Sequence, residues 1–233
     1  MTKKSELTKD EMKNLIRKVV ILFLFVPVFL GVLTLVPAGT FHYWQVYAYE
    51  ASLVIPLIFF LVYFLRNDPA FLIRRMKTKE KEKTQRLIQI IANLLFFSAF
   101  IVCGLDRRFG WSDIPVFVVL LADGISLCGY AMVFFVYKEN SFAARVIEVE
   151  KNQTVVTTGL YRFVRHPMYA GVIFMWLPIP IALGSFWGLI PISTIPVALV
   201  LRILNEEKVL NRDLPGYKEY CQKTKYRLIP FVW

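Results

Sequence analysis

A long uncharged run near the C-terminus most strongly limits what this chain can fold into. Residues 167–201 contain no Asp, Glu, Lys or Arg, and as one helix they would reach about 50 Å, whereas the hydrocarbon core of a bilayer is only about 30 Å thick. Pro178, Pro180 and Gly184 lie near the middle of the run and favour a break there. The run therefore predicts two membrane helices that fold back and return the flanking polar segments to one membrane face.

Four further apolar segments are long enough to cross a bilayer. The chain is 57% hydrophobic with a mean hydropathy of +0.52, well above that of a soluble domain. We predict an all-α integral membrane protein with about six transmembrane helices, at 19–37, 45–65, 87–105, 114–137, 168–183 and 186–201. Residues 1–137 hold the N-terminal tail and the first four helices, and 138–233 hold the functional core with the last two helices and a cytosolic tail. We expect these two parts to form one structural domain.

The positive charge of the chain is distributed by membrane side. Of the 28 Lys and Arg residues, 26 fall in the termini and in the loops on the same side, and only Arg107 and Arg108 fall in the other loops. The positive-inside rule then places both termini in the cytoplasm, and the basic loops are expected to touch anionic lipid headgroups. The net charge of +11 thus reports topology; nucleic-acid binding would need a basic face with exposed aromatics on a soluble fold.

Several other features are assigned structural roles. The tail 1–18, helical in pattern from Asp10, is expected to lie on the membrane surface, and the charged connector after residue 65 is interpreted as a solvated face. Asp123 lies inside a span, where acids are often functional, but a polar contact between helices is favoured because the other polar motifs are about half a bilayer away. The cysteines lack metal-ligand spacing and are predicted to be free: Cys103, Cys128 and Cys221.

The segment GLYRFVRHPMYAG, residues 159–171, precedes and enters the uncharged run. Gly159 permits a tight turn, and Pro167 suits the first turn of a helix, whose free N–H groups would favour an anion. His166 is predicted to donate a hydrogen bond to a ligand and not to act as a base. No metal site is expected, because the one other histidine, His42, is predicted to lie on the opposite side of the membrane. The alternative is a basic aromatic interface that only anchors the chain in the membrane.

The segment RILNEEKVL, residues 202–210, leaves the run at its other end. Arg202 and Glu206 are four residues apart and share a helix face. They form either a local salt bridge or a site in which Arg202 binds a carboxylate and Glu206 accepts hydrogen bonds from an amine or a ribose hydroxyl. Glu207 points to another face and is expected to be solvated. A later tyrosine pair, Tyr217 and Tyr220, is expected to serve packing.

Together these residues resemble the isoprenylcysteine carboxyl methyltransferase family and related membrane methyltransferases. The first motif of that family is matched by Gly159, Tyr161, Arg165, His166, Pro167 and Tyr169. The second is matched by Arg202, Glu206, Glu207, Tyr217, Tyr220, Pro230 and Phe231. The resemblance covers roughly 138–233 and implies an integral membrane enzyme that uses S-adenosylmethionine.

The resemblance also implies roles for individual residues. Arg202 and Glu206 are expected to be catalytic, and Arg202 and Arg165 to bind the substrate. The cofactor contacts are expected to come from Gln153, Thr154, Val155, Val156, Tyr161, His166, Pro167, Met168, Tyr169 and Glu206. The chain departs from the family at Gln153, where His is frequent, and near Val146, where an upstream polar contact falls.

The sequence leaves the methyl acceptor open. A carboxylate is already ionised at neutral pH, so its methylation needs positioning, a counter-cation and exclusion of water. A gap between helices that faces the lipid would admit a prenyl or acyl chain, which favours a lipophilic acceptor such as a prenylcysteine-like carboxylate. A phospholipid amine would need a proton acceptor, either Glu206 or a water assisted by a tyrosinate, and a small thiol is a further alternative. A transporter or a non-catalytic membrane binding protein is less favoured, because the Pro-rich break occurs only once.

Overall fold

The computed structural model describes residues 8–76, 83–143, 149 and 153–233, and every regular element in this part of the chain is a helix. The N-terminal half contains α1 (Lys9–Ala38), α2 (Trp44–Asn67), the short α3 (Pro69–Arg75), α4 (Lys83–Phe109) and α5 (Val116–Glu139). The C-terminal half contains the 3₁₀ turn η1 (Gly159–Arg162), α6 (Pro167–Trp176), α7 (Ile179–Ala182), α8 (Leu189–Ile192), α9 (Thr194–Asp213) and α10 (Tyr217–Lys223). The predicted all-α class is confirmed.

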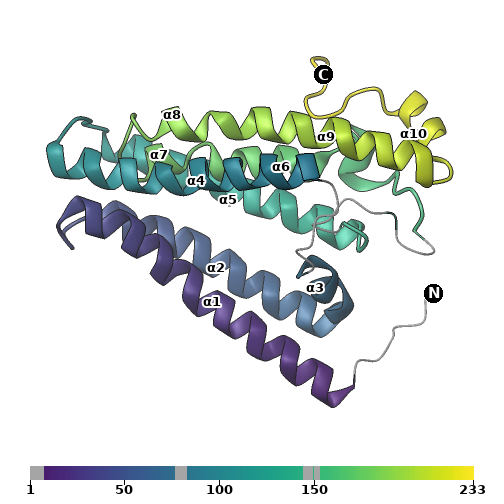
Figure 1. Cartoon of the computed structure of the whole chain (residues 1–233), viewed down its shortest axis with the longest axis horizontal. Coiled ribbons are helices and arrows are strands. Elements are labelled where there is room, and N and C mark those ends of the chain that lie inside the picture. The colour runs from purple at the N-terminus through teal and green to yellow at the C-terminus, as the bar shows by residue number, and fades with distance from the viewer. Residues whose placement is uncertain (1–7, 77–82, 144–148, 150–152) are drawn as a thin grey trace.

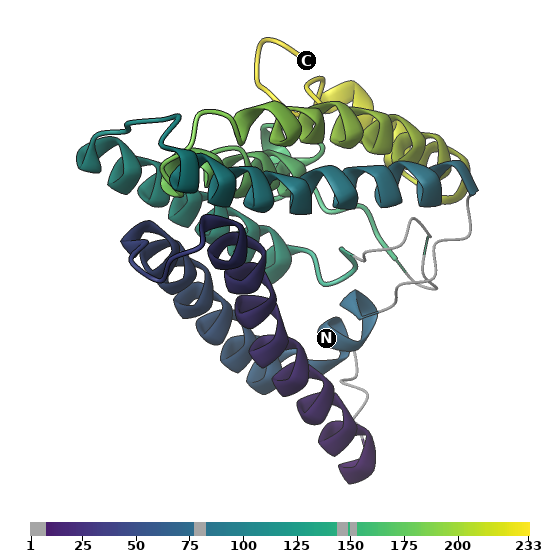
Figure 2. The ribbon, with the colours of Figure 1, turned by 60° about the vertical axis from the view of Figure 1, so that its left-hand side comes forward.

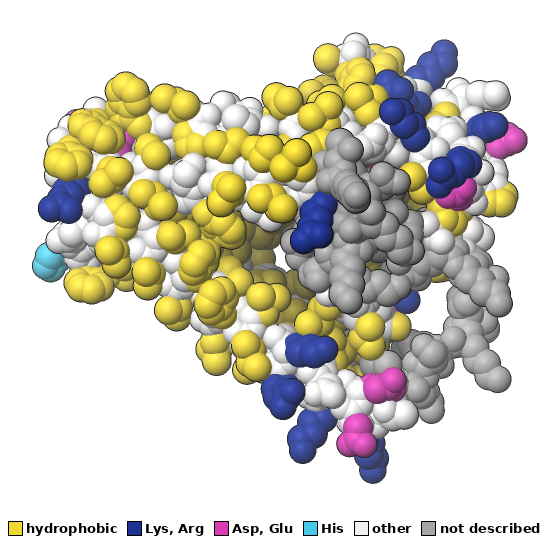
Figure 3. Space-filling view, viewed as in Figure 1, with side chains coloured by type: hydrophobic (Ala, Val, Ile, Leu, Met, Phe, Trp, Pro, Cys, Tyr) yellow, Lys and Arg dark blue, Asp and Glu magenta, His cyan; other side chains and the backbone are white. Residues whose placement is uncertain are grey.

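Five helices of the described chain are long and apolar enough to cross a membrane, which makes this a multi-pass membrane protein. They are Lys9–Ala38, Trp44–Asn67, Arg86–Phe109, Val116–Glu139 and Leu189–Asp213. The span predicted at 168–183 corresponds to the shorter apolar stretch Pro167–Ala182, which is only about 24 Å long as a helix. The sixth crossing therefore stays a prediction. Hydrophobic side chains cover much of the face in Figure 3, with Lys and Arg gathered mainly toward one end.

Helices α4, α5, α6 and α9 run alongside one another, whereas α1 leans away from them toward the N-terminus (Figures 1 and 2). Near the loop that joins α1 to α2, α1 packs tightly on α4. A Cβ atom added at Gly104 would lie 2.3 Å from the Thr34 carbonyl oxygen, so only glycine allows this approach. The N-terminal pair is thus anchored at one end of the molecule.

The N-terminal tail differs from its prediction. Residues from Lys9 onward continue without a break into α1, because no helix-breaking residue separates them from the apolar run. Thr8 caps the helix: its side chain accepts from the Glu11 backbone N–H while the Glu11 carboxylate accepts from the Thr8 N–H, a capping box. The helical pattern from Asp10 is therefore part of α1 and not a separate surface segment.

The uncharged run turns back between α7 and α8. Gly184 adopts φ +75° there, a conformation that favours glycine. Asp106, near the end of α4, is only 1% exposed. Its carboxylate accepts hydrogen bonds from Ser112 and from Ser185, the residue that follows Gly184 in the turn. The reversal returns α9 to α6, so that the two polar segments predicted to form a site meet.

Two smaller predictions are confirmed. The Ser52 hydroxyl on α2 donates a 3.1 Å hydrogen bond to the buried Asp123 carboxylate on α5, which is the expected polar contact between helices. The three cysteines are free.

Helix α6 owes its position to a close crossing with α5. A Cβ atom at Gly129 would lie 2.5 Å from the Met175 backbone nitrogen, and one at Gly171 would lie 2.7 Å from a Val133 methyl. The two backbones can approach this closely because neither glycine has a side chain. The crossing fixes the position of α6 along α5, and therefore the position of the His166–Pro167 corner at the N-terminus of α6.

Candidate active site

The RHP segment forms a corner at the start of α6. Gly159 adopts φ +57° and opens η1, and Pro167 occupies the first turn of α6, as predicted for both. The backbone N–H groups of Arg165 and His166 donate 2.9 Å hydrogen bonds to the carbonyl oxygens of Tyr226 and Arg227. The C-terminal segment therefore folds back over the corner and holds it.

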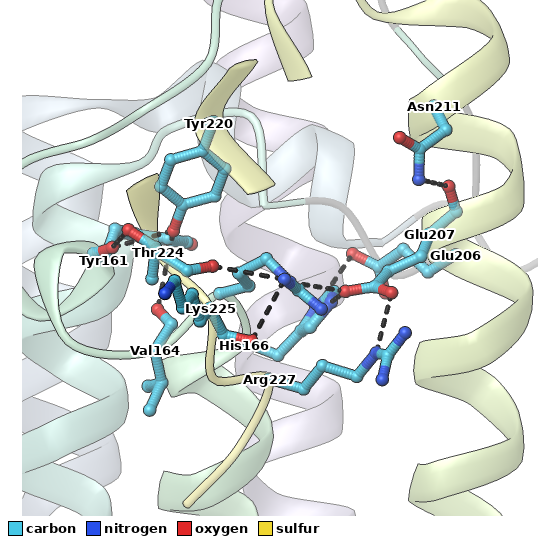
Figure 4. Close-up of polar contacts among 11 residues, drawn as sticks. Tyr161, Val164, His166, Glu206, Glu207, Asn211, Tyr220, Thr224, Lys225 and Arg227 are labelled. Carbon is cyan, nitrogen blue, oxygen red and sulfur yellow. Dashed lines mark hydrogen bonds and ion pairs between the residues drawn. The ribbon is translucent and has the colours of Figure 1, made fainter. Parts of the chain in front are cut away.

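Glu207 is the anion at the centre of a buried ionic network (Figure 4). Its Oε1 lies 2.7 Å from Arg165 Nε and 3.2 Å from His166 Nε2, and its Oε2 lies 2.8 Å from Arg227 Nε. Glu207 is only 6% exposed, so the prediction that it is solvated was wrong. One residue beyond Glu206 lies about 100° around a helix, and that direction faces the returning C-terminal segment, which helical periodicity does not reveal.

Arg165 is turned toward this network. Besides its pairing with Glu207, its Nη1 donates to the carbonyl oxygens of Thr224 and Lys225 at 3.1 and 3.2 Å. The side chain is 8% exposed. These contacts engage Nε and Nη1, although Arg165 also borders the polar pocket described below. Its role as a substrate ligand stays a prediction.

Tyr169 joins the two residues predicted to be catalytic. Arg202 Nε donates a 2.9 Å hydrogen bond to the Tyr169 hydroxyl oxygen, and the Tyr169 O–H donates to Glu206 Oε2 at 2.5 Å. Arg202 and Glu206 therefore do share a helix face, and a buried tyrosine from α6 fixes both. The sequence placed Tyr169 among the cofactor contacts and did not reveal this bridging position, which depends on α6 and α9 lying side by side.

His166 stands between the two glutamates. Its Nε2 faces Glu207 at 3.2 Å, and its Nδ1 faces Glu206 Oε1 at 4.0 Å. A carboxylate can only accept a hydrogen bond, so Nε2 carries the proton that points to Glu207. Nδ1 is then the nitrogen that is directed toward Glu206.

A polar pocket of about 90 Å³ opens in front of these residues. Its wall contains all of the predicted cofactor contacts except Pro167, which is buried in the first turn of α6. The wall is formed by Asn140, Phe142, Ala143, Gln153, Thr154, Val155, Val156, Tyr161, Arg165, His166, Met168, Tyr169, Arg202, Glu206, Val209, Leu210, Leu214, Tyr217 and Tyr220. Val146 lies outside the described residues. The structure thus brings the first motif, the second motif and the stretch 153–156 to one pocket.

Three tyrosines close one side of the polar pocket. Tyr220 donates a 2.7 Å hydrogen bond to the Tyr161 carbonyl oxygen, and the Tyr161 hydroxyl accepts from Asn140 Nδ2 at 2.9 Å. The Tyr217 hydroxyl is buried and has no hydrogen-bond partner among the described residues. Tyr217 and Tyr220 do pack together, as predicted, but they also line the pocket.

Burial keeps these phenols protonated. Desolvation raises the pKa of Tyr220 to about 12 and raises the pKa values of Tyr161 and Tyr217 well above their ordinary range. At neutral pH the three side chains are therefore neutral hydrogen-bonding groups and not bases.

An apolar cavity of about 460 Å³ adjoins the polar pocket. Its wall comes from α4, α5, α6 and α9, with one contribution from the end of α3: Arg75, Ile88, Gln89, Ala92, Asn93, Phe96, Phe97, Val133, Tyr137, Met168, Tyr169, Val172, Met175, Trp176, Ile195, Ala198, Leu199 and Arg202. Met168, Tyr169 and Arg202 belong to both walls. The two cavities therefore meet at these three side chains.

Comparison with known proteins agrees with this arrangement. Residues 117–215 match the family model described as phospholipid methyltransferase, and no curated protein matches the chain. The matched range runs from α5 to the end of α9 and contains both polar motifs up to Glu207. Over residues 117–215 the chain thus carries the pattern of the phospholipid methyltransferase family. Members of that family are membrane methyltransferases like the isoprenylcysteine carboxyl methyltransferases. The match therefore confirms the resemblance seen in the sequence.

Proposed function

We propose that this protein is an S-adenosylmethionine-dependent methyltransferase that methylates a lipophilic acceptor at the cytosolic membrane face, with a prenylcysteine-like carboxylate as the first candidate. The observation that carries the proposal is the shared wall of the two cavities. A polar pocket suited to a nucleoside and an apolar cavity suited to an alkyl or prenyl chain meet at Met168, Tyr169 and Arg202. Group transfer needs two ligands that meet in this way.

The residues of the polar pocket fit S-adenosylmethionine. The Glu206 side chain, 26% exposed, can offset positive charge on the ligand. The buried Tyr217 hydroxyl lacks a partner among the described residues, and residues 153–156 lie outside any regular element and border the pocket. Both can therefore bond to polar groups of the nucleoside. When bound, S-adenosylmethionine supplies an electrophilic methyl group on a positively charged sulfur.

The protein side chains then orient the two ligands. His166 Nδ1 can accept a hydrogen bond from the ligand amino group, because Nε2 is already directed to Glu207; this replaces the donor role predicted for His166. Tyr169 holds Arg202 and Glu206 in fixed positions. Arg202, on the wall of both cavities, would pair with the acceptor carboxylate and keep it next to the polar pocket.

The name of the matching family favours a second candidate, the N-methylation of a phospholipid amine. Such an amine must lose a proton before or during transfer. The raised pKa values of Tyr161, Tyr217 and Tyr220 oppose a tyrosinate base, which leaves Glu206 as the proton acceptor. A carboxylate acceptor makes no such demand and is therefore placed first. A small thiol would leave most of the apolar cavity unfilled and ranks third.

We place the methyltransferase core at 138–233, with residues 1–137 completing the same structural domain. Helices α4 and α5 supply much of the wall of the apolar cavity. The selection of the acceptor chain is therefore assigned to the N-terminal part, and the binding of the methyl donor to the C-terminal part.

Calorimetry with the detergent-solubilised protein tests the proposal. S-adenosylmethionine is expected to bind, and labelled methyl groups are expected on prenylcysteine more than on phosphatidylethanolamine or thiols. Arg202→Ala is expected to abolish turnover while cofactor affinity changes only several-fold. Absence of cofactor binding would refute the enzyme, preferred labelling of phosphatidylethanolamine would establish the second candidate, and loss of cofactor binding in Arg202→Ala would assign that arginine to the donor site.

A further inference from the structure

A second arginine, Arg75, lines the apolar cavity together with Arg202. It is the last residue of α3, in the charged connector that the sequence analysis interpreted as a solvated face. Helix α3 is held firmly: the Asp68 carboxylate caps its N-terminus by accepting from the Phe71 N–H at 3.0 Å. Phe71 and Leu72 are buried, at 0% and 4% exposure, in the core between α2 and α5. The position of Arg75 at the cavity wall is therefore set by the fold.

No carboxylate pairs with Arg75 within the described part of the chain. Its guanidinium lies over the Tyr137 ring, 4.7 Å from the centroid. The neighbouring Arg74 is different, because it pairs with Asp68 and donates to the Ser141 carbonyl oxygen. A half-buried guanidinium on an apolar wall gains most from an anion, which it can bind with two parallel hydrogen bonds.

Arg75 and Arg202 act at the same end of the cavity. The Arg75 guanidinium lies over the ring of Tyr137, near the end of α5, and both Tyr137 and Arg202 belong to the same cavity wall. Most of the remaining wall is apolar, with Phe96, Phe97 and Trp176 among its members. The cavity therefore has two cationic groups at one end and room for a hydrocarbon chain beyond them.

We propose that Arg75 and Arg202 form an anion subsite, so that the acceptor is an amphiphile whose carboxylate or phosphate lies between the two guanidiniums while its chain fills the apolar cavity. The inference rests on the proposed function and narrows its substrate class to anionic amphiphiles. Arg75 would determine specificity, and Arg202 would also hold the acceptor next to the polar pocket. A neutral amphiphile of equal chain length would fill the same cavity with lower affinity.

Binding of brominated amphiphiles tests the subsite without any methyl transfer. Bromine quenches tryptophan fluorescence at short range, and Trp176 lies in the cavity wall. Binding in the cavity is therefore measured as the saturable part of the quenching that disappears in the Trp176→Phe variant. A brominated fatty acid, a brominated alkyl phosphate and a brominated fatty alcohol of equal length are the probes. Arg75→Gln is expected to weaken binding of at least one of the two anions about tenfold and to leave the alcohol unchanged. Arg75→Lys keeps the charge but not the planar pair of donors, so it should weaken binding of that anion less than Arg75→Gln.

The matched control is Arg66→Gln, which removes an exposed cation from the last turn of α2, outside the cavity. Equal anion binding by Arg75→Gln and Arg66→Gln would overturn the subsite, as would a parallel loss of alcohol binding, which would mean that Arg75 only shapes the cavity. The comparison of fatty acid with alkyl phosphate identifies the anion. Selective anion binding in a protein that methylates no acceptor would sustain the subsite and refute the proposed function. Methyl transfer by a protein whose anion binding is unchanged by Arg75→Gln would support the proposed function and refute the subsite.

Discussion

Single side chains set the charge balance of the candidate site. Glu206 and Glu207 are adjacent in the chain, but Glu206 faces the polar pocket, whereas Glu207 faces Arg165, Arg227 and the Nε2 of His166. The pair thus divides into a residue available to ligands and a residue that holds the wall. The Tyr169 hydroxyl has a third role: it is hydrogen-bonded to both Arg202 and Glu206 and fixes their positions where the two cavities meet.

Tyr169→Phe is expected to lower kcat about ten- to hundredfold, because the phenol bridge contributes hydrogen bonds to charged groups worth about 1.5–3 kcal/mol. The ring and its packing remain, but the same hydrogen bonds contribute to folding, so the unfolding temperature should also fall by several degrees. Methyl-transfer assays and thermal unfolding measure the two effects. Tyr47→Phe, which removes a hydroxyl that bonds the exposed Phe41 carbonyl, is the control, and equal activity of both variants would contradict the bridging role.

Glu207→Ala is expected to destabilise the protein by about 3–5 kcal/mol, because it leaves the buried Arg165 and its neighbour Arg227 without an anion. Glu207→Gln keeps the shape and should show a smaller loss. Thermal or denaturant unfolding in detergent measures both, with the exposed Glu219→Gln on α10 as the control. A Glu207→Ala variant as stable as the control would show that the network contributes nothing to folding.

At the scale of elements, small residues and turns determine which helices meet. The close crossing of α5 and α6 at Gly129 and Gly171 sets the position of the RHP corner. The reversal at Gly184 returns α9 to α6. Asp106 holds that reversal through a hydrogen bond with Ser185, at the end of the molecule away from the candidate site. The C-terminal segment then closes the corner through backbone hydrogen bonds.

Gly129→Ala is expected to destabilise the protein by about 1–3 kcal/mol, because its methyl group would force the backbones of α5 and α6 apart. Activity should fall as well, since α6 carries His166 and Tyr169. Gly124→Ala on the same helix is the matched control: its Cβ would meet nothing within 4 Å, so stability should stay equal or rise slightly. Equal behaviour of the two variants would show that the crossing tolerates a side chain.

At the scale of the whole molecule, the position of the candidate site can be compared with the membrane orientation that the charge distribution predicts. The candidate site lies at the end that carries α10 and the basic C-terminal residues, whereas the last turn of α4, with Arg107 and Arg108, lies at the other end. The positive-inside rule then predicts that the site opens to the cytosol. A cytosolic site would receive a water-soluble methyl donor from one side and a lipophilic acceptor from the bilayer.

Cysteine labelling tests this orientation. In a protein freed of its native cysteines, Lys218→Cys on α10 and Phe41→Cys in the first loop should react with an impermeant maleimide from opposite sides of sealed vesicles, Lys218→Cys from the cytosolic side. Both positions are exposed, and the cysteine-free protein reports the background. The predicted topology places an odd number of crossings between these two positions, so reaction of both from one side would contradict that topology. Reaction of Lys218→Cys from the outside would contradict the cytosolic site.

The sequence by itself was sufficient for the all-α membrane class, the turn at Gly159 and the start of α6 at Pro167. These follow from local rules: hydropathy over a span and the conformations open to glycine and proline. The expected cofactor contacts came from the resemblance to a known family and not from such rules. The burial of Glu207, the bridge through Tyr169 and the place of Arg75 on the apolar cavity were decided only by the tertiary structure. Each depends on which segments pack side by side, and helical periodicity gives the direction of a side chain without giving the partner it meets.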